Sequence, residues 1–295
     1  MARRKPATTH GICVVDKPSG VTSHDVVGML RKRFGERQVG HAGTLDPDAT
    51  GVLVVAVGMS TKLLRFIEKT TKRYEGEVVL GTETSPLDAA GAETASHEMG
   101  EVTVAAAQAV VDEHLMGPIE QIPPMVSAIK IDGRRLHELA REGIEIDRPP
   151  RPVTIHEFTV RGQPEPGVLS IEVLCSSGTY VRTLAADLGR LLGGGAHLRN
   201  LRRTAVGEFT IAEARSPDDC ELLPVETAVR GLAKVPADDN LARLVATGRV
   251  LPRPIEMGPG PWAVFSPDGT LIAVYEAFRE HEAKPSVVLP TAGRG

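Results

Sequence analysis

A continuous apolar run, V-L-V-V-A-V at 52 to 57, lies between Gly51 and Gly58. The run is rich in β-branched side chains, which favours a strand that is buried on both faces. Such a strand belongs in the middle of a sheet. The segment H-A-G-T-L-D-P-D-A-T-G at 41 to 51 is therefore predicted to lie in the loop that enters this central strand. Loops on rigid strands are common places for chemistry.

The remaining segments mix strands and helices without a regular alternation of the two. We therefore expect an α+β fold with a mixed, largely antiparallel central sheet and flanking helices. Thr22 or Ser23 can cap the first helix, which ends at Gly35. Further strands are expected at 11 to 16, 74 to 82, 125 to 131, 153 to 161 and 168 to 175. Further helices are expected at 104 to 116, 134 to 141 and 181 to 192.

The length and composition predict one large domain and a small appendage. A chain of 295 residues with 41% hydrophobic residues can bury a full core. A short helix at 241 to 246 precedes W-A-V-F, a Pro-Asp-Gly turn, L-I-A-V-Y and S-V-V-L, which is the pattern of a small β-barrel. We expect a flexible basic N-terminus at 1 to 10, a main domain at 11 to 236 and a barrel at 237 to 295.

The net charge of −4 hides a strong asymmetry along the chain. Residues 1 to 75 hold thirteen Lys and Arg against seven Asp and Glu. Between Tyr74 and Ile129 there are ten acidic residues and no Lys or Arg, so this stretch is expected to face away from phosphates. Five arginines stand against one aspartate from 176 to 204. A one-sided basic surface for a polyanionic partner is consistent with this distribution, although a solvated charged face is the commoner cause of any single run.

The expected compartment is the cytoplasm. The first ten residues lack the apolar run of a secretory signal, and no later stretch has the length of a membrane span. Cys13, Cys175 and Cys220 are scattered, without the C-x-x-C spacing of a zinc or redox site. We interpret the three cysteines as small buried apolar residues and expect no metal.

Four side chains are candidates for chemistry on a nucleotide. Asp46 stands before Pro47 in a loop rich in Gly and Thr, where a carboxylate could act as nucleophile or base, although an Asp-Pro pair alone more often marks an ordinary turn. Tyr74 and Tyr180 are two of only three tyrosines and lie beside basic residues, so they could hold an everted base or merely pack on a sheet. Arg182 could pair with Asp46 or bind phosphate.

Several motifs, in order, resemble those of the bacterial tRNA pseudouridine-55 synthases of the TruB type. The segment H-A-G-T-L-D-P-D-A-T-G-V-L at 41 to 53 is similar to the catalytic motif of that family and is highly specific. The supporting matches are D-K-P-S-G-V-T-S at 16 to 23, K-R-Y at 72 to 74, S-A-I-K at 127 to 130, G-T-Y-V-R-T-L at 178 to 184 and L-R-R at 201 to 203. The chain departs from the family at Val126, where relatives often carry an aromatic residue.

The resemblance implies a role for each matching residue. Asp46 is the expected catalytic aspartate, in an ion pair with Arg182, and His41 lies in the loop that helps to turn the nucleotide outward. Tyr74 is expected to stack on the uracil, while Tyr180 and Leu201 line its pocket. Weaker candidates for supporting the pocket walls or the RNA backbone are Lys17, Lys130, Arg134, Arg202 and Arg203. An RNA-gripping insertion is expected at 124 to 152, which also includes Arg135 and Arg141, and the C-terminal residues resemble a PUA-like domain.

The implied reaction moves a uracil ring from N1 to C5 on the same ribose. It needs no redox cofactor and no ATP, and the expected partner is the T arm of tRNA, bound by a monomer. The carboxylate could attack C1′ or remove a ribose proton, and the sequence leaves both routes open. Two other classes remain: an RNA-binding or RNA-folding module that does not use Asp46, and a glycosidase in which Asp48 would be the second carboxylate.

Overall fold

The computed structural model describes residues 7–85, 87–89, 91–127, 130–131, 134–136, 139, 142, 144 and 146–290. Its largest element is a nine-stranded sheet in which every strand pair is antiparallel except β3 with β12. The expected mixed, largely antiparallel sheet is confirmed. The strands follow the order β1 (Gly11–Lys17), β3 (Thr50–Val57), β12 (Ala196–Val206), β4 (Lys72–Leu80), β11 (Val168–Cys175), β10 (Arg151–Glu165) and β7 (Gly117–Gln121), with β2 (Val39–Ala42) on β3 and β13 (Phe209–Thr210) on β12.

Strand β3 is buried on both faces, as its apolar run predicts. All six residues from 52 to 57 have no exposed surface. Leu53, Val55 and Val57 pack into the core under helix α1 (Ser23–Phe34), and the alternate residues pack into a second core with helix α2 (Leu64–Glu68). The second core also includes residues of the 3-10 helices η1 (Gly58–Leu63) and η2 (Val225–Val229).

Helix α1 begins and ends where the sequence predicts. The Thr22 side chain accepts a hydrogen bond from the Asp25 backbone, and the Asp25 carboxylate accepts one from Thr22, which completes a capping box. Gly35 ends the helix in the left-handed conformation, at φ 62°. Val26 and Leu30, on the inner face of this helix, are fully buried.

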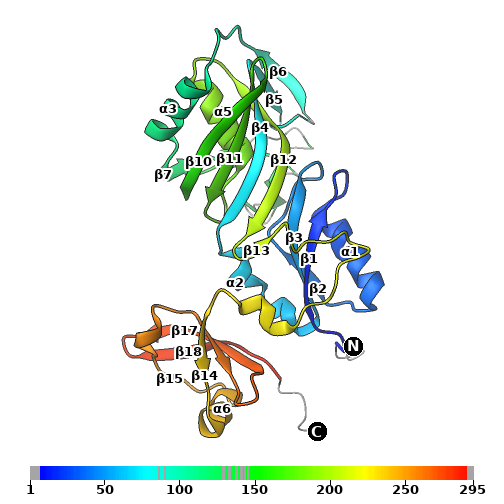
Figure 1. The fold of residues 1–295 in the computed structure, drawn as a ribbon, viewed down its shortest axis with the longest axis vertical. Coiled ribbons are helices and arrows are strands. Elements are labelled where there is room, and N and C mark those ends of the chain that lie inside the picture. Colours follow the sequence, from blue (N-terminus) through cyan, green and yellow to red (C-terminus); the bar gives the residue numbers. More distant parts are fainter. Residues whose placement is uncertain are drawn as a thin grey trace.

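The other half of the sheet is covered by helices α3 (Val104–His114) and α5 (Val181–Leu191). Ala107 and Val111 of α3 share one core with Leu184 and Leu188 of α5 and with the apolar residues of β4, β10 and β11. Figure 1 shows these strands and helices as the upper part of the molecule, with β1, β2, β3 and α1 beside its lower end. A short ladder of β5 (Thr82–Ser85) and β6 (Ala92–Ser96) extends from the top.

The two halves of the sheet meet where β12 pairs with β3, and the backbones approach closely at Gly51. Arg203 of β12 is paired with Gly51 of β3 on one side and with Tyr74 of β4 on the other. A Cβ atom at Gly51 would lie 2.2 Å from the Arg203 carbonyl oxygen, and the φ of Gly51 is +101°. Only glycine fits a position with this conformation and this proximity. The contact places the loop before β3 against β4 and β12.

Two expected elements between 125 and 141 are confirmed only in part. Residues 125 to 127 lie outside any strand, and the expected strand is found as β8 (Lys130–Ile131), which pairs with β9 (Arg134–Arg135). The helix expected from 134 begins after β9, since Leu136 and Leu139 are helical. Lys130 is paired with Arg135 across the Asp132-Gly133 sequence, and Asp-Gly favours a tight hairpin. Arg141 lies outside the described residues.

The C-terminal residues form a separate curled sheet in the order β14, β16, β17, β18 and β15. Its core contains the fully buried Trp262. Figure 1 shows this sheet at the bottom of the molecule. Its elements are β14 (Ala233–Pro236), α6 (Asp239–Ala246), β15 (Leu251–Pro252), η3 (Ile255–Met257), β16 (Trp262–Phe265), β17 (Leu271–Arg279) and β18 (Glu282–Val288). Among the helices that the structure describes, none has the length and apolar character needed to cross a membrane.

Substitution of Gly51 by Ala is predicted to destabilise the fold strongly. The new methyl group would meet the Arg203 backbone and force a positive φ on alanine, at a cost of about 2–4 kcal/mol. Gly28→Ala is the matched control, because Gly28 lies in α1 with no atom within 4 Å of an added Cβ, and alanine there is predicted to stabilise by up to about 1 kcal/mol. Urea unfolding measures both, and equal changes in the two variants would contradict the role of the Gly51 contact.

Candidate active site

The loop that carries Asp46 is held by its neighbours through main-chain hydrogen bonds. The Ser23 hydroxyl is buried, accepts a hydrogen bond from the Leu45 amide at 2.9 Å, and donates one to the Leu45 carbonyl at 3.1 Å. On the other side of Asp46, the Pro47 carbonyl accepts a hydrogen bond from the Gly20 amide at 3.0 Å. Both residues that flank Asp46 are therefore fixed by the segment that leads into α1.

Lys17 also holds this loop, from inside the protein. Its ammonium group donates to the carbonyls of Pro18, Val21 and Pro47 at 2.7–2.9 Å. The side chain has no exposed surface, and this burial lowers the pKa of Lys17 despite the nearby carboxylates. The expectation that Lys17 contacts the RNA backbone is wrong, because all three of its donors are used inside the protein.

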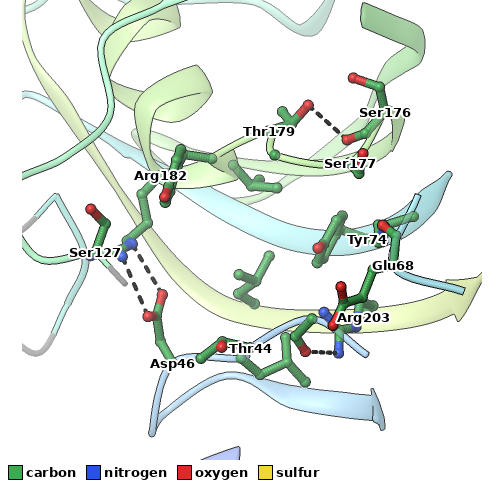
Figure 2. Close-up of a pocket in the computed structure, with 17 residues that line it drawn as sticks. Thr44, Asp46, Glu68, Tyr74, Ser127, Ser176, Ser177, Thr179, Arg182 and Arg203 are labelled. Atoms are coloured by element: carbon green, nitrogen blue, oxygen red, sulfur yellow. Dashed lines mark hydrogen bonds and ion pairs between the residues drawn. The ribbon is translucent and has the colours of Figure 1, made fainter. Parts of the chain in front are cut away.

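Asp46 forms an ion pair with Arg182. The Nε of Arg182 lies 3.1 Å from Oδ2 of Asp46, and a second guanidinium nitrogen lies 3.4 Å from Oδ1. Figure 2 shows the two contacts side by side. Arg182 is almost fully buried, with 5% of its side chain exposed, whereas Asp46 keeps 39% exposed. The arginine thus orients a carboxylate whose other edge remains open.

Arg182 is itself held by other groups. It donates to the Val126 carbonyl at 2.9 Å and lies 3.4 Å from Oδ2 of Asp88. Its helix begins at Tyr180, whose backbone amide and carbonyl both bind the side-chain amide of the buried Gln121, at 3.0 and 3.3 Å. The position of Arg182 is therefore set by β7 and by the start of α5.

Asp46 and Arg182 lie at one side of a cavity of about 280 Å³. Tyr74, Tyr180 and Leu201 line the same cavity, so the structure brings together five of the residues predicted from the sequence. Tyr74 is 9% exposed, and burial raises the pKa of its hydroxyl and that of Tyr180. Both hydroxyls are therefore protonated and neutral at physiological pH. Each side chain offers an apolar ring face and a polar hydroxyl.

A bulge in strand β12 aims Leu201 at this cavity. Asn200 and Leu201 face a single residue of β4, Gly76, and Asn200 adopts a positive φ of 54°. A bulge of this kind bends the strand and redirects its side chains. Figure 2 shows Tyr74 and Arg203 on the far side of the cavity from Asp46.

Three other predicted residues have surroundings that differ from the expectation. His41 is in strand β2 and not in a loop, and burial lowers the pKa of its imidazole, which is consequently neutral. Arg203 is 1% exposed and donates to the carbonyls of Val52 and Gly43 at 2.7 and 3.0 Å, so the expectation that it contacts the RNA backbone is wrong. Arg202 is half-exposed and pairs with Asp16 at 2.7 Å.

Arg134, one of the arginines of the expected RNA-gripping insertion, is exposed. Arg134 forms an ion pair with Glu142 at 2.5 Å, and 47% of its side chain is exposed. The side chain of Lys130 lies outside the described residues.

Several functional residues were missed by the sequence analysis. Asp88 lies in the acidic stretch that was expected to face away from phosphates, yet it contacts Arg182 in the site. Lys72, in the K-R-Y motif, lines the cavity and is 6% exposed. Ser23 stood in a quoted motif, but only the fold reveals its two bonds to Leu45. No local pattern marks Gln121, whose partner is 59 positions away.

Comparison with family models identifies the class of protein. Residues 31–181 match the N-terminal domain of the TruB family of pseudouridylate synthases. Residues 182–221 match the tRNA pseudouridylate synthase B C-terminal domain, and residues 236–290 match the C-terminal model of tRNA pseudouridine synthase II. The chain belongs to the TruB family, as its motifs predict.

Curated relatives match almost the whole chain. A tRNA pseudouridine synthase B from Streptomyces coelicolor is 45% identical over 95% of this chain and 96% of its own. Proteins of the same name from Rhodococcus jostii and Geobacillus thermodenitrificans are 44% and 40% identical, over 99% and 95% of this chain and 99% and 98% of their own. A chain in a solved Cbf5-Nop10-Gar1 complex shares the fold, with a TM-score of 0.71 and 24% identity over 95% of this chain and 84% of that one.

Removal of the Ser23 hydroxyl is predicted to loosen the loop that carries Asp46. Ser23→Ala leaves the Leu45 amide without its partner in a buried site, at a cost of about 1–3 kcal/mol. The exposed Ser19→Ala is the control and should change stability by less than about 0.5 kcal/mol. Urea unfolding gives the stability, and hydrogen exchange at Leu45 reports the local effect. Unchanged exchange at that amide in Ser23→Ala would refute the assignment.

Proposed function

We propose that this enzyme converts uridine 55 in the T arm of tRNA to pseudouridine, with Asp46 as the catalytic carboxylate. The observation that carries the proposal is the half-open carboxylate of Asp46, held by the buried Arg182 at the side of a cavity that also contains Tyr74. The relatives named tRNA pseudouridine synthase B support the substrate. The family resemblance supports uridine 55 as the nucleotide that is modified.

Asp46 serves as the group that acts on the ribose. Asp46 lines the cavity and keeps 39% of its side chain exposed, while Arg182 contacts both carboxylate oxygens and balances the negative charge. An oriented carboxylate can attack C1′ or take a proton from the sugar, and either route starts from the same geometry. The bonds from Ser23 and Lys17 on each side of Asp46 keep this geometry ready before RNA binds.

Tyr74, Tyr180 and Leu201 hold the everted uracil. The target lies in a stacked loop, and its extrusion costs a few kcal/mol, which stacking on Tyr74 offsets. The apolar walls exclude water from the cleaved intermediate, which would otherwise be hydrolysed. No group in this scheme requires a cofactor or a metal ion.

The rest of the chain supplies RNA contacts in this proposal. Residues 11 to 236 are the catalytic domain, in which 124 to 152 grip the RNA, and residues 237 to 295 form a PUA-like appendage. The exposed ring of Phe278 supports that assignment, since Arg279 and Lys284 each lie 5.0 Å from its centre. Aromatic and cationic side chains together suit single-stranded nucleic acid. The enzyme acts as a cytoplasmic monomer.

The test of this proposal is conversion of an unmodified tRNA transcript, mapped by carbodiimide-dependent reverse-transcription stops. Wild-type protein should give one stop, at position 55. Asp46→Asn should lower the rate by at least about 10³-fold, because the amide can neither attack nor accept a proton. Asp48→Asn, two residues away and exposed, is the matched control and should retain activity.

Three outcomes would overturn the proposal. Conversion by Asp46→Asn at the wild-type rate would remove the carboxylate from the mechanism. Release of free uracil, with a corresponding loss of RNA mass, would identify a glycosidase. Binding without any conversion by the wild-type protein would identify an RNA-binding module.

A further inference from the structure

Two buried cations line the cavity beside Tyr74, on the side away from the Asp46–Arg182 pair. Lys72 of β4 is 6% exposed and Arg203 of β12 is 1% exposed. Arg203 is paired in register with Tyr74, and Lys72 precedes Tyr74 by two positions on the same strand. Figure 2 shows Arg203 near Tyr74 and Glu68, across the cavity from Asp46.

Neither cation forms a salt bridge with the residues that the structure describes. The ammonium of Lys72 donates to the carbonyls of Glu68 and Thr70, the latter at 2.6 Å. Arg203 donates to the two backbone carbonyls described above. A buried cation that lacks an anionic partner is costly to keep, and such a cost is commonly associated with function.

The charges that face Lys72 come from three other elements. Burial, and to a lesser extent the positive charge of Arg203, lowers the pKa of Lys72 to about 8. Cys175 on β11 and Glu68 on α2 raise this pKa. The thiol of Cys175 is neutral, since burial raises its pKa to about 11. The carboxylate of Glu68 forms no ion pair with Lys72 in the described part of the chain. Below pH 8, Lys72 and Arg203 are therefore both cationic on this side of the cavity.

We propose that Lys72, assisted by Arg203, stabilises the negative charge that the uracil ring carries after its glycosidic bond breaks. The inference rests on the proposed function and assigns Lys72 as a further catalytic residue. Tyr74, the residue expected to stack on the uracil, lines the same cavity, is paired with Arg203 and follows Lys72 by two positions on β4. Fixed charges aimed at charge that develops in the transition state contribute strongly in a site without water.

The step is balanced within the substrate. When the bond between C1′ and N1 breaks, both electrons leave with the ring, which spreads one negative charge over N1, O2 and O4. After the ring turns, C5 donates an electron pair to C1′ and the new bond removes that charge. C5 then loses its proton and N1 gains one. The cations hold the charged ring in place between these two events, and no oxidant or reductant takes part.

The decisive measurement compares the rates of two substrates. Transcripts carry uridine or 5-fluorouridine at the target position, and single-turnover rates come from loss of that nucleoside in nuclease digests. Fluorine stabilises the ring anion, so a substrate that carries it depends less on Lys72. Lys72→Met should lower the conversion rate of uridine by about 10²–10³-fold with unchanged RNA affinity. The rate for 5-fluorouridine should fall by a factor about ten times smaller, or less. The exposed Lys69→Met is the control and should slow neither substrate.

A pH profile supplies the second, independent test. Lys72 is cationic below its pKa of about 8 and neutral above it, so the wild-type single-turnover rate should fall as the pH rises through 8. Lys72→Arg should lack this fall, because a guanidinium stays protonated. This variant keeps a donor for the two carbonyls, and its profile decides the question if Lys72→Met does not fold.

The results separate the inference from the proposed function. If wild-type protein converts neither substrate, the proposed function fails. If wild type converts uridine but Lys72→Met slows both substrates equally, or Lys72→Arg keeps the fall above pH 8, Lys72 only supports the fold and the inference is overturned.

Discussion

The contact between Gly51 and the Arg203 backbone joins the two halves of the main sheet, and the site depends on it. Strand β3 brings the Asp46 loop from one half, while β4 and α5 bring Tyr74 and Arg182 from the other. Strand β12 is paired with both halves at this level, so a residue with a Cβ at position 51 would separate them. The cavity at this seam is lined by segments far apart in the chain, some from strands and some from loops. The Asp46 loop is fixed in place by hydrogen bonds from Ser23 and Lys17, so the carboxylate is oriented before any partner binds.

The two sides of the cavity carry different charges. At one side, the negative charge of Asp46 is balanced by Arg182, which is in turn shared with Asp88. At the other, Lys72 and Arg203 donate hydrogen bonds to backbone carbonyls, and neither forms a salt bridge within the described residues. A reaction that leaves positive charge on a sugar and negative charge on a base matches this division, because the carboxylate would face the sugar and the cations would face the base. The acidic net charge of the whole chain has no bearing on this local field.

Local patterns were enough to predict the parts of the fold in which neighbours in sequence are neighbours in space. The apolar run of β3 and the Thr22 and Gly35 caps of α1 are examples. The motifs also identified six residues that line the cavity, through family resemblance, although Arg203 was given a different role. Lys17 and Arg203 were misplaced because a long cationic side chain looks the same in a sequence whether its head meets phosphate or folds back onto carbonyls. Asp88 and Gln121 were missed because their partners are 94 and 59 positions away.

The Asp46–Arg182 pair is poorly explained as a device for stability. Burying a guanidinium carries a desolvation cost of several kcal/mol, and a packed apolar pair in its place is often as stable or more so. Here Asp46 offsets little of that cost, because its carboxylate is 39% exposed and water partly screens its charge. The main effect of burying Arg182 beside Asp46 is therefore to orient the half-exposed carboxylate. The geometry is therefore best understood as preparation for a substrate that completes the burial of Asp46 when it binds.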